Sequence, residues 1–229
     1  MKPINSANSS LISATYSYLG SRCILGNVEA VTYLYGNAWK ESPALIRTIE
    51  QLQYCLTSAE IDEDTDGIYN SEFLYYWGMI CMGEVSPLIV KDLGTARTCF
   101  NKIKKIVPKV RARLAYIALR LSEEPAKSDS NVERLGELRQ WASRHDMFSL
   151  IALSKISFFQ YLQEYQECET DIPELPIQAL RLIGPPYQKG HPVAVKFHND
   201  IYTHIGINEA MLTGISESRI NADVLYDYY

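Results

Sequence analysis

The sequence predicts an all-α protein built from antiparallel helix hairpins. Through most of its 229 residues, apolar side chains recur at spacings of three and four, which is the period of a helix with one buried face. The strict alternation and β-branched clusters that are typical of strands are scarce. Short breaks separate most of the expected helices, and short breaks place successive helices antiparallel.

Helical patterning divides the chain into segments with recognisable local ends. The expected helices span 11–25, 28–40, 43–59, 71–83, 92–106, 109–122, 131–144, 147–165, 176–183, 192–205 and 216–226. Gly26-Asn27 is typical of a helix C-terminus and Ser42-Pro43 of an N-terminus, while Pro108 ends one helix and permits the next. The 147–165 helix is apolar on more than one face, which predicts a position between neighbours.

Three regions are expected along the chain. Residues 1–10 are predicted to be a flexible N-terminus, and residues 11–169 a helical repeat domain. Residues 170–229 combine a proline-containing connection with C-terminal helices that pack on the same domain.

Two segments are similar to each other and contain glycine inside a helix. Tyr18 to Asn27 reads YLGSRCILGN and Tyr76 to Glu84 reads YWGMICMGE, and after the second Asp92, Ala96 and Phe100 follow at intervals of four, on one helix face. A glycine inside a helix costs about 1 kcal/mol relative to alanine. We therefore expect close helix packing at Gly20 and Gly78, with Ala96 and Phe100 on the helix opposite Gly78.

This pattern resembles the Sel1-like repeat family, which is related to the tetratricopeptide repeats. Residues 71–107 carry the resemblance best, and residues 11–59 carry it in their first helix. The resemblance implies an α-solenoid, a right-handed superhelix of stacked hairpins with a concave groove. It also implies a non-enzymatic protein–protein interaction module or adaptor that binds a segment of a protein partner. An irregular helical bundle without repeats is the alternative.

The sixteen tyrosines supply the candidate binding residues. Tyrosine suits recognition surfaces because it offers a large contact area and a polar tip at low entropic cost. The inner faces of successive first helices line the groove of a solenoid. Tyr16 and Tyr75, with the neighbouring Tyr76, are therefore the expected groove residues, and packing in the core or at its edge is the alternative for each.

The stretch DEDTDGIYNSEF, Asp62 to Phe73, is similar to a calcium-binding loop. Asp62, Asp64, Asp66 and Gly67 fit the first half of an EF-hand loop, but Glu72 falls one residue short of the final ligand position. One hypothesis is a calcium- or metal-responsive helical regulator that uses residues 62–72. The other is a solvated acidic connector between two helices, and no metal site is predicted.

Evidence for an enzyme is weaker. His191, His198 and His204 lie near Asp200, and Asp200 and His204 share a helix face, but a third ligand at helical spacing is missing. A helical enzyme with a histidine-containing site in 191–204 is a further alternative. No phosphate-binding, dinucleotide-binding or nucleophile-elbow motif is present, so neither catalytic residues nor a cofactor are predicted.

Composition narrows the classes of partner. A formal net charge of −5 disfavours nucleic acid as a main partner, although six cations cluster at Lys102, Lys104, Lys105, Lys109, Arg111 and Arg113. No segment has the length of a membrane span, and the N-terminus lacks the pattern of a signal peptide. Five widely spaced cysteines indicate a reducing compartment. A soluble cytoplasmic protein is expected, and its oligomeric state is not predicted.

Overall fold

The computed structural model describes residues 6–64, 66–122, 128–167 and 176–204, and within them the chain is all-helical. The expected fold class is thus confirmed at the level of all-α. Contacts between Cα atoms divide the chain into two compact units, Met1–Ser122 and Glu123–Tyr229. This division falls inside the 11–169 segment that the sequence analysis treats as one domain.

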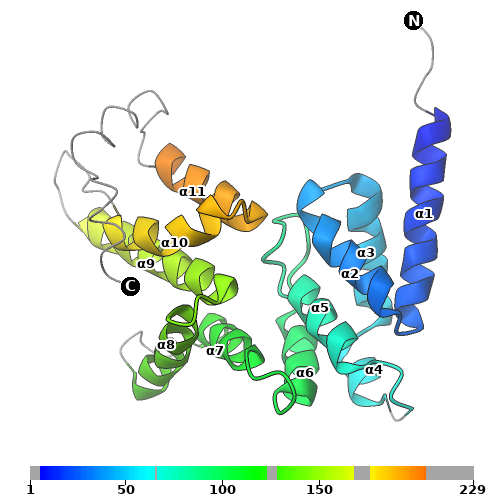
Figure 1. Ribbon diagram of the computed structural model, residues 1–229, viewed down its shortest axis with the longest axis horizontal. Helices are drawn as coiled ribbons and strands as arrows, with labels where there is room; N and C mark the ends of the chain where they lie inside the picture. Colours follow the sequence, from blue (N-terminus) through cyan, green and yellow to red (C-terminus); the bar gives the residue numbers. More distant parts are fainter. Residues whose placement is uncertain (1–5, 65, 123–127, 168–175, 205–229) are drawn as a thin grey trace, which may run out of the picture. The chain divides into compact units, whose positions relative to one another are not determined.

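In its described residues, the first unit holds seven α-helices and one short 3₁₀ helix (Figure 1). They are α1 (Ser6–Ile24), α2 (Val28–Asn37), η1 (Ala38–Lys40), α3 (Pro43–Cys55), α4 (Ser58–Asp62), α5 (Ser71–Cys81), α6 (Leu93–Ile103) and α7 (Val110–Arg120). The second unit holds α8 (Asp129–Ala142), α9 (Met147–Glu167), α10 (Ile177–Gln188) and α11 (Pro192–His204) among its described residues.

The predicted helix ends are confirmed where local chemistry fixes them. Gly26 has φ +71°, a left-handed conformation that ends α1 and favours glycine. The side chain of Asn27 then accepts a hydrogen bond of 2.8 Å from the Ala30 amide and begins α2. Pro43 occupies the first turn of α3, and Pro108 lies between α6 and α7.

The largest differences from the predicted helices occur at three places. The first helix begins at Ser6, inside the segment expected to be flexible. The expected 43–59 helix is two helices, because Leu56 leaves the helical conformation and Thr57, which is extended, caps α4. The helix predicted for 176–183 ends before Pro185, whereas α10 continues to Gln188. The helix predicted for 216–226 lies outside the described residues.

Close packing of α5 on α6 organises the first unit. A Cβ atom placed on Gly78 would lie 2.7 Å from Cε1 of Phe100, so only glycine permits this approach. Trp77 of α5 and both Ala96 and Phe100 of α6 are fully buried. The other side of α5 packs on α2, and α7 packs on α6. The predicted close packing at Gly78, with Phe100 on the opposite helix, is confirmed.

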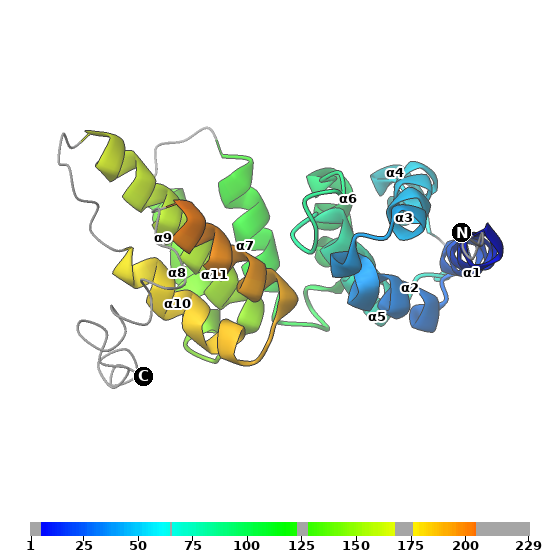
Figure 2. The ribbon, with the colours of Figure 1, turned by 90° about the horizontal axis from the view of Figure 1, so that it is seen from above.

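At the centre of the second unit lies α9. It packs on both α8 and α10, as its apolar faces predict, and α11 covers α10 (Figure 2). One buried cluster joins Phe158 of α9 to Ala179, Leu180 and Ile201, and a second joins Ile151 of α9 to Ile183 and Ala194. Of the helices in the described part of the chain, none has both the length and the apolar character needed to span a bilayer.

Candidate functional site

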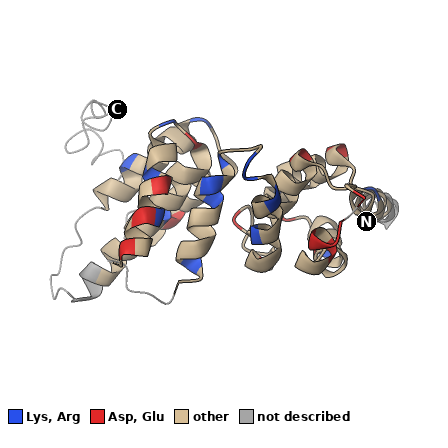
Figure 3. Ribbon diagram, turned by 90° about the horizontal axis from the view of Figure 1, so that it is seen from below, with Lys and Arg blue, Asp and Glu red and all other residues tan. Residues whose placement is uncertain are grey.

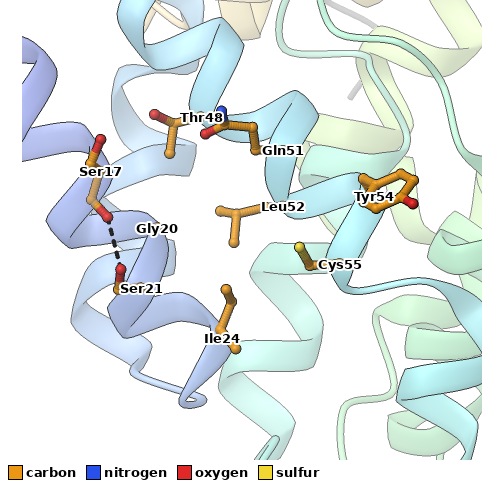
Figure 4. A pocket seen from close by; sticks show the side chains of 9 residues that line it. All are labelled: Ser17, Gly20, Ser21, Ile24, Thr48, Gln51, Leu52, Tyr54 and Cys55. Atoms are coloured by element: carbon orange, nitrogen blue, oxygen red, sulfur yellow. Dashed lines mark hydrogen bonds between the residues drawn. The ribbon is translucent and has the colours of Figure 1, made fainter.

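A groove with a volume of about 450 Å³ lies between α1 and α3 in the first unit (Figure 4). One wall comes from α1 and the other from α3. The lining residues are Ser17, Gly20, Ser21, Ile24, Thr48, Gln51, Leu52, Tyr54 and Cys55. Ligand-binding clefts in proteins typically have volumes of about 300–1,000 Å³, so this groove is large enough to hold several side chains of a partner.

Helical spacing explains why these residues share one groove. Ser17, Gly20, Ser21 and Ile24 occupy positions i, i+3, i+4 and i+7, which form one face of α1. Thr48, Gln51, Leu52 and Cys55 have the same spacing on α3. Both walls therefore run for about two helical turns, roughly 10 Å at 1.5 Å per residue.

Small side chains on α1 create the space. Gly20 is buried, and a Cβ atom placed on it would lie 3.2 Å from Cγ2 of Thr48, so α1 and α3 nearly touch there. Ser17 and Ser21, on either side of Gly20, are exposed and leave the groove open. Thr48 and Leu52 are buried at 6% and 2% exposure and form its floor.

The chemistry of the groove is uncharged. None of its lining residues is Asp, Glu, Lys, Arg or His. The Ser21 hydroxyl donates to the Ser17 carbonyl oxygen at 3.1 Å, and the Thr48 hydroxyl donates to the Ala44 carbonyl oxygen at 3.0 Å. Both hydroxyl protons are thus engaged within their own helices. The groove offers apolar contacts, the Gln51 amide, hydroxyl oxygens and the exposed Cys55 thiol, a set of groups that can bind a polypeptide.

Apolar side chains lie exposed on the groove walls. Ile24 is 43% exposed, and the Cys55 side chain is also exposed. Tyr54, which is 87% exposed, lies at the edge of the groove on the side of α3 that is turned away from α1 (Figure 4). An accessible apolar wall beside a partly filled cleft is typical of an interaction site.

Tyr16, the first predicted binding residue, is half-buried and does not line this groove. Burial, and then the neighbouring Tyr33, raise the pKa of Tyr16, while its hydrogen bond with Ser42 partly offsets them. Tyr16 is thus hydrogen-bonded to Ser42 at the start of α3 and is not part of the groove.

Tyr75 and Tyr76, the other two predicted residues, belong to an aromatic row on α5. Tyr76 lies between Tyr35 of α2 and Tyr75, with ring centroids 5.4 Å apart in both pairs. The ammonium nitrogen of Lys109 lies 4.3 Å from the centre of the Tyr75 ring. Both tyrosines are half-buried, so part of each side chain packs between helices and part is exposed to solvent.

Arg113, on α7, holds the Tyr75 side chain in place through a hydrogen bond. Its side chain is 3% exposed, and it donates to the Tyr75 hydroxyl at 3.2 Å and to the Lys109 carbonyl oxygen at 3.0 Å. A buried guanidinium requires such acceptors because its desolvation is costly. The Tyr75 hydroxyl is therefore part of the packing between α5 and α7.

The acidic loop forms a hydrogen-bonded connection between α4 and α5. The two carboxylate oxygens of Asp64 accept the amides of Ile68 and Tyr69 at 3.0 and 3.1 Å. The Tyr69 hydroxyl donates to the Ile24 carbonyl oxygen at 3.1 Å, which ties the loop to the end of α1. In the described ranges, no three His, Cys, Asp or Glu side chains gather as a metal site would require.

Two of the three histidines expected in an alternative active site, His198 and His204, are in aromatic packing. The His198 ring stacks on Tyr187 with centroids 4.0 Å apart, and Tyr202 meets it edge-on at 4.8 Å. His204 meets Phe158 edge-on at 5.7 Å, and Asp200 is exposed. Burial lowers the pKa of His191 and of His198, which keeps both imidazoles neutral at pH 7.

Burial also determines the pKa of the buried cysteine thiols in the first unit. Burial raises the pKa of Cys23 to about 12, and burial followed by the charge of Asp92 raises the pKa of Cys99 to about 12. A protonated thiol is a poor nucleophile. Cys55, in the wall of the groove, is exposed and free.

Sequence reasoning placed the candidate site on tyrosines and missed the groove between α1 and α3. The available signal was the small-residue face of α1, Ser17, Gly20 and Ser21, followed by Ile24 at helical spacing. This face of α1 forms a groove only because α3 supplies the second wall. Since α2 separates α1 from α3 in the sequence, the pattern of α1 alone does not predict the groove. Compared with known proteins, the chain matches no protein-family model, no curated protein and no solved structure.

Proposed function

We propose that this protein is a non-enzymatic adaptor that binds a helical segment of another protein in the groove between α1 and α3. The observation that carries the proposal is the uncharged groove of about 450 Å³, whose two walls each present residues at i, i+3, i+4 and i+7. An amphipathic helix presents its apolar anchors at this same spacing, and helix-in-groove binding uses it.

The partner follows from the lining chemistry. Leu52 at the floor and Ile24 on the wall favour aliphatic anchors, and the small residues on α1 leave room for them. The lack of charge among the lining residues disfavours a charged metabolite, whose burial needs ionic or multiple polar partners. The bound face is therefore apolar, and the partner's polar face remains in solvent.

The resemblance to Sel1-like repeats extends the proposal to the whole architecture. In it, the hairpins form a right-handed superhelix, with the tight α5–α6 pair at Gly78 and Phe100 as the best-matched unit. The close approach of α1 and α3 at Gly20 supports a related packing earlier in the chain. The free thiols of Cys23, Cys55, Cys81 and Cys99 suit a reducing cytoplasm, where we place the protein.

Photo-crosslinking tests the groove directly. A benzophenone amino acid at position 54, where Tyr54 is 87% exposed at the edge of the groove, is expected to capture a partner in a lysate of the native host. The same group at position 18, where Tyr18 is 63% exposed but outside the groove, serves as the control. Mass spectrometry of the crosslinked peptide is expected to identify a segment with apolar residues at helical spacing.

A second pair of variants separates groove binding from surface contact. Ser21→Leu fills the groove and is expected to reduce crosslinking at position 54 by about tenfold or more, since it occupies the space of an anchor residue. Ser13→Leu adds the same side chain to an exposed position of α1 outside the groove and is expected to have no effect. Equal capture by both variants, or a crosslinked segment rich in charge, would overturn the proposal.

A further inference from the structure

The α6–α7 segment concentrates positive charge in a chain whose formal net charge is −5. Residues 93–122 contain no Asp or Glu, although they contain eight Lys and Arg residues, Arg97, Lys102, Lys104, Lys105, Lys109, Arg111, Arg113 and Arg120. Most of these lie where α6 ends and α7 begins, and Figure 3 shows them as blue segments of α6 and of the following connection. A local excess of positive charge attracts negatively charged partners and repels positively charged ones.

Four of these cations form an exposed group that we call the basic turn: Lys104, Lys105, Lys109 and Arg111. In the described part of the chain, no carboxylate forms an ion pair with any of the four. Lys104 donates to the Asn101 side-chain oxygen at 3.3 Å, and Lys109 lies over the Tyr75 ring. The neighbouring Lys102 differs, because it donates to the Asp62 carbonyl oxygen at 3.1 Å and contacts α4.

The backbone of the basic turn is fixed before any partner binds. The amides of Ile106 and Val107 both bond the Ile103 carbonyl oxygen, at 2.9 and 2.8 Å, and the Arg111 amide bonds the Pro108 carbonyl oxygen at 3.1 Å. Ile103 and Val110, at the two ends of the turn, are buried at 2% and 0% exposure. A preorganised charge group loses little backbone entropy on binding.

An apolar side chain lies among the charges. Ile106 is 69% exposed between Lys105 and Pro108. An exposed isoleucine at this position can make a hydrophobic contact with a partner whose charged groups bind the surrounding lysines.

Nucleic acid fits this surface poorly. Base recognition by single-strand binding proteins uses exposed aromatic rings as stacking platforms. In residues 93–122 the two aromatic side chains, Phe100 and Tyr116, are 0% and 2% exposed, and the nearby Tyr75 ring is covered by Lys109 at 4.3 Å. Three of the four cations are lysines, which act as point charges and lack the planar fork that binds phosphate bidentately.

We infer that the basic turn is a docking surface for an acidic polypeptide segment, rich in Asp or Glu and carrying an aliphatic residue that contacts Ile106. This surface is separate from the α1–α3 groove, and the inference does not rest on the proposed function. The carboxylates of such a segment would attract the four lysine and arginine side chains of the basic turn. Attraction between exposed charges of opposite sign raises the association rate more than it lowers the dissociation constant.

Fluorescence anisotropy with the full chain tests the inference. The probe is a labelled glutamate-rich peptide with one central leucine, and its counterpart has glutamine in place of every glutamate. The glutamate peptide is expected to bind and the glutamine peptide not to bind. Raising the salt concentration from about 0.05 M to about 0.5 M is expected to weaken binding by at least about tenfold, because exposed charges are screened.

Matched variants locate the surface. Lys104→Glu/Lys105→Glu is expected to weaken binding by about tenfold or more, whereas Lys40→Glu/Arg47→Glu, which reverses two exposed cations elsewhere in the first unit, is expected to change it less than about twofold. Ile106→Ser is expected to weaken binding of the leucine-containing peptide but not of a leucine-free one. Circular dichroism checks that each variant is folded.

Contrary outcomes are distinct. Absence of binding by the wild-type chain, an equal loss in both charge-reversal variants, or tighter binding of a labelled oligothymidine than of the acidic peptide would overturn the inference. Ser21→Leu is expected to bind the acidic peptide normally, so a failure of the groove proposal and a failure of the basic turn are separable.

Discussion

Among single residues, Gly78 is the position where the fold depends most directly on an absent side chain. Gly78→Ala would place a methyl group 2.7 Å from the ring of Phe100, which is fully buried. We expect the free energy of unfolding to fall by about 1–3 kcal/mol, as for other overpacked cores. Urea denaturation followed by circular dichroism measures the change.

Two further variants define the cause of the Gly78 effect. Gly36→Ala, in α2 of the same unit, has no atom within 4 Å of the new Cβ and is expected to be neutral or stabilising. Phe100→Leu combined with Gly78→Ala is expected to recover part of the loss relative to the sum of the single variants. Equal destabilisation at Gly36 and Gly78 would show that helix flexibility, rather than packing, is responsible.

Asp64 decides between the two hypotheses for the acidic loop. Asp64→Ala removes the acceptor for the amides of Ile68 and Tyr69, and we expect a loss of about 1–2 kcal/mol in unfolding free energy, as for other lost capping acceptors. The loss is expected to be equal with millimolar calcium and with chelator. A calcium-dependent rise in the wild-type Tm that Asp64→Ala abolishes would instead favour the calcium-responsive regulator.

His198 gives the second unit a predictable pH dependence. Burial lowers its native pKa below 6.5, so the unfolded chain binds more protons between the two pKa values. The stability contributed by the neutral ring is present above pH 6.5 and is lost as the pH falls toward the native pKa. We expect His198→Phe, which keeps an aromatic ring beside Tyr187, to reduce the stability loss between about pH 7.5 and pH 5.5.

The matched control for His198 is Thr203→Val, a substitution at an exposed position of α11 that carries no ionisable side chain. The Thr203→Val variant is expected to leave the pH profile of unfolding close to that of the wild type. A profile unchanged by His198→Phe would contradict the assignment.

At the scale of elements, Tyr75 connects α5 to α7 through the buried Arg113. Tyr75→Phe removes one hydrogen-bond acceptor of the guanidinium while preserving the ring, and we expect a loss of about 1–3 kcal/mol in unfolding free energy. Tyr54→Phe, at 87% exposure, is expected to change stability by less than about 0.5 kcal/mol. Equal stabilities would mean that the Tyr75 hydroxyl is free to serve the binding role predicted from the sequence.

The lengths of the elements were predictable where a side chain or a glycine fixes the end. The α1–α2 junction follows from Gly26 and Asn27, and the start of α3 follows from Pro43 in its first turn, since the Ser42 side chain makes no capping hydrogen bond. The continuation of α10 was not predictable from local rules. Pro185 and Pro186 cannot donate backbone hydrogen bonds, but their carbonyl oxygens accept the amides of Lys189 and His191, and Pro186 is buried.

For the whole molecule, the division after Ser122 predicts independent folding of the first unit. Residues 1–122 expressed alone are expected to be helical and to unfold cooperatively, because buried residues such as Trp77, Phe100 and Ile103 pack within this unit. Trp77 fluorescence, with that of the partly exposed Trp39, follows the transition in urea. A helical fragment that melts without a cooperative transition would show that the unit needs the rest of the chain.

The sequence by itself determined the helical class, most helix ends and the tight contact at Gly78, because helical periodicity, caps and a mid-helix glycine act over a few residues. Only the tertiary structure decided where the candidate site lies. The groove requires α1 and α3, which α2 separates in the sequence, and the predicted Tyr75 is held by Arg113 from α7. Such contacts depend on which helix faces meet, and the pattern of one helix does not specify its neighbour.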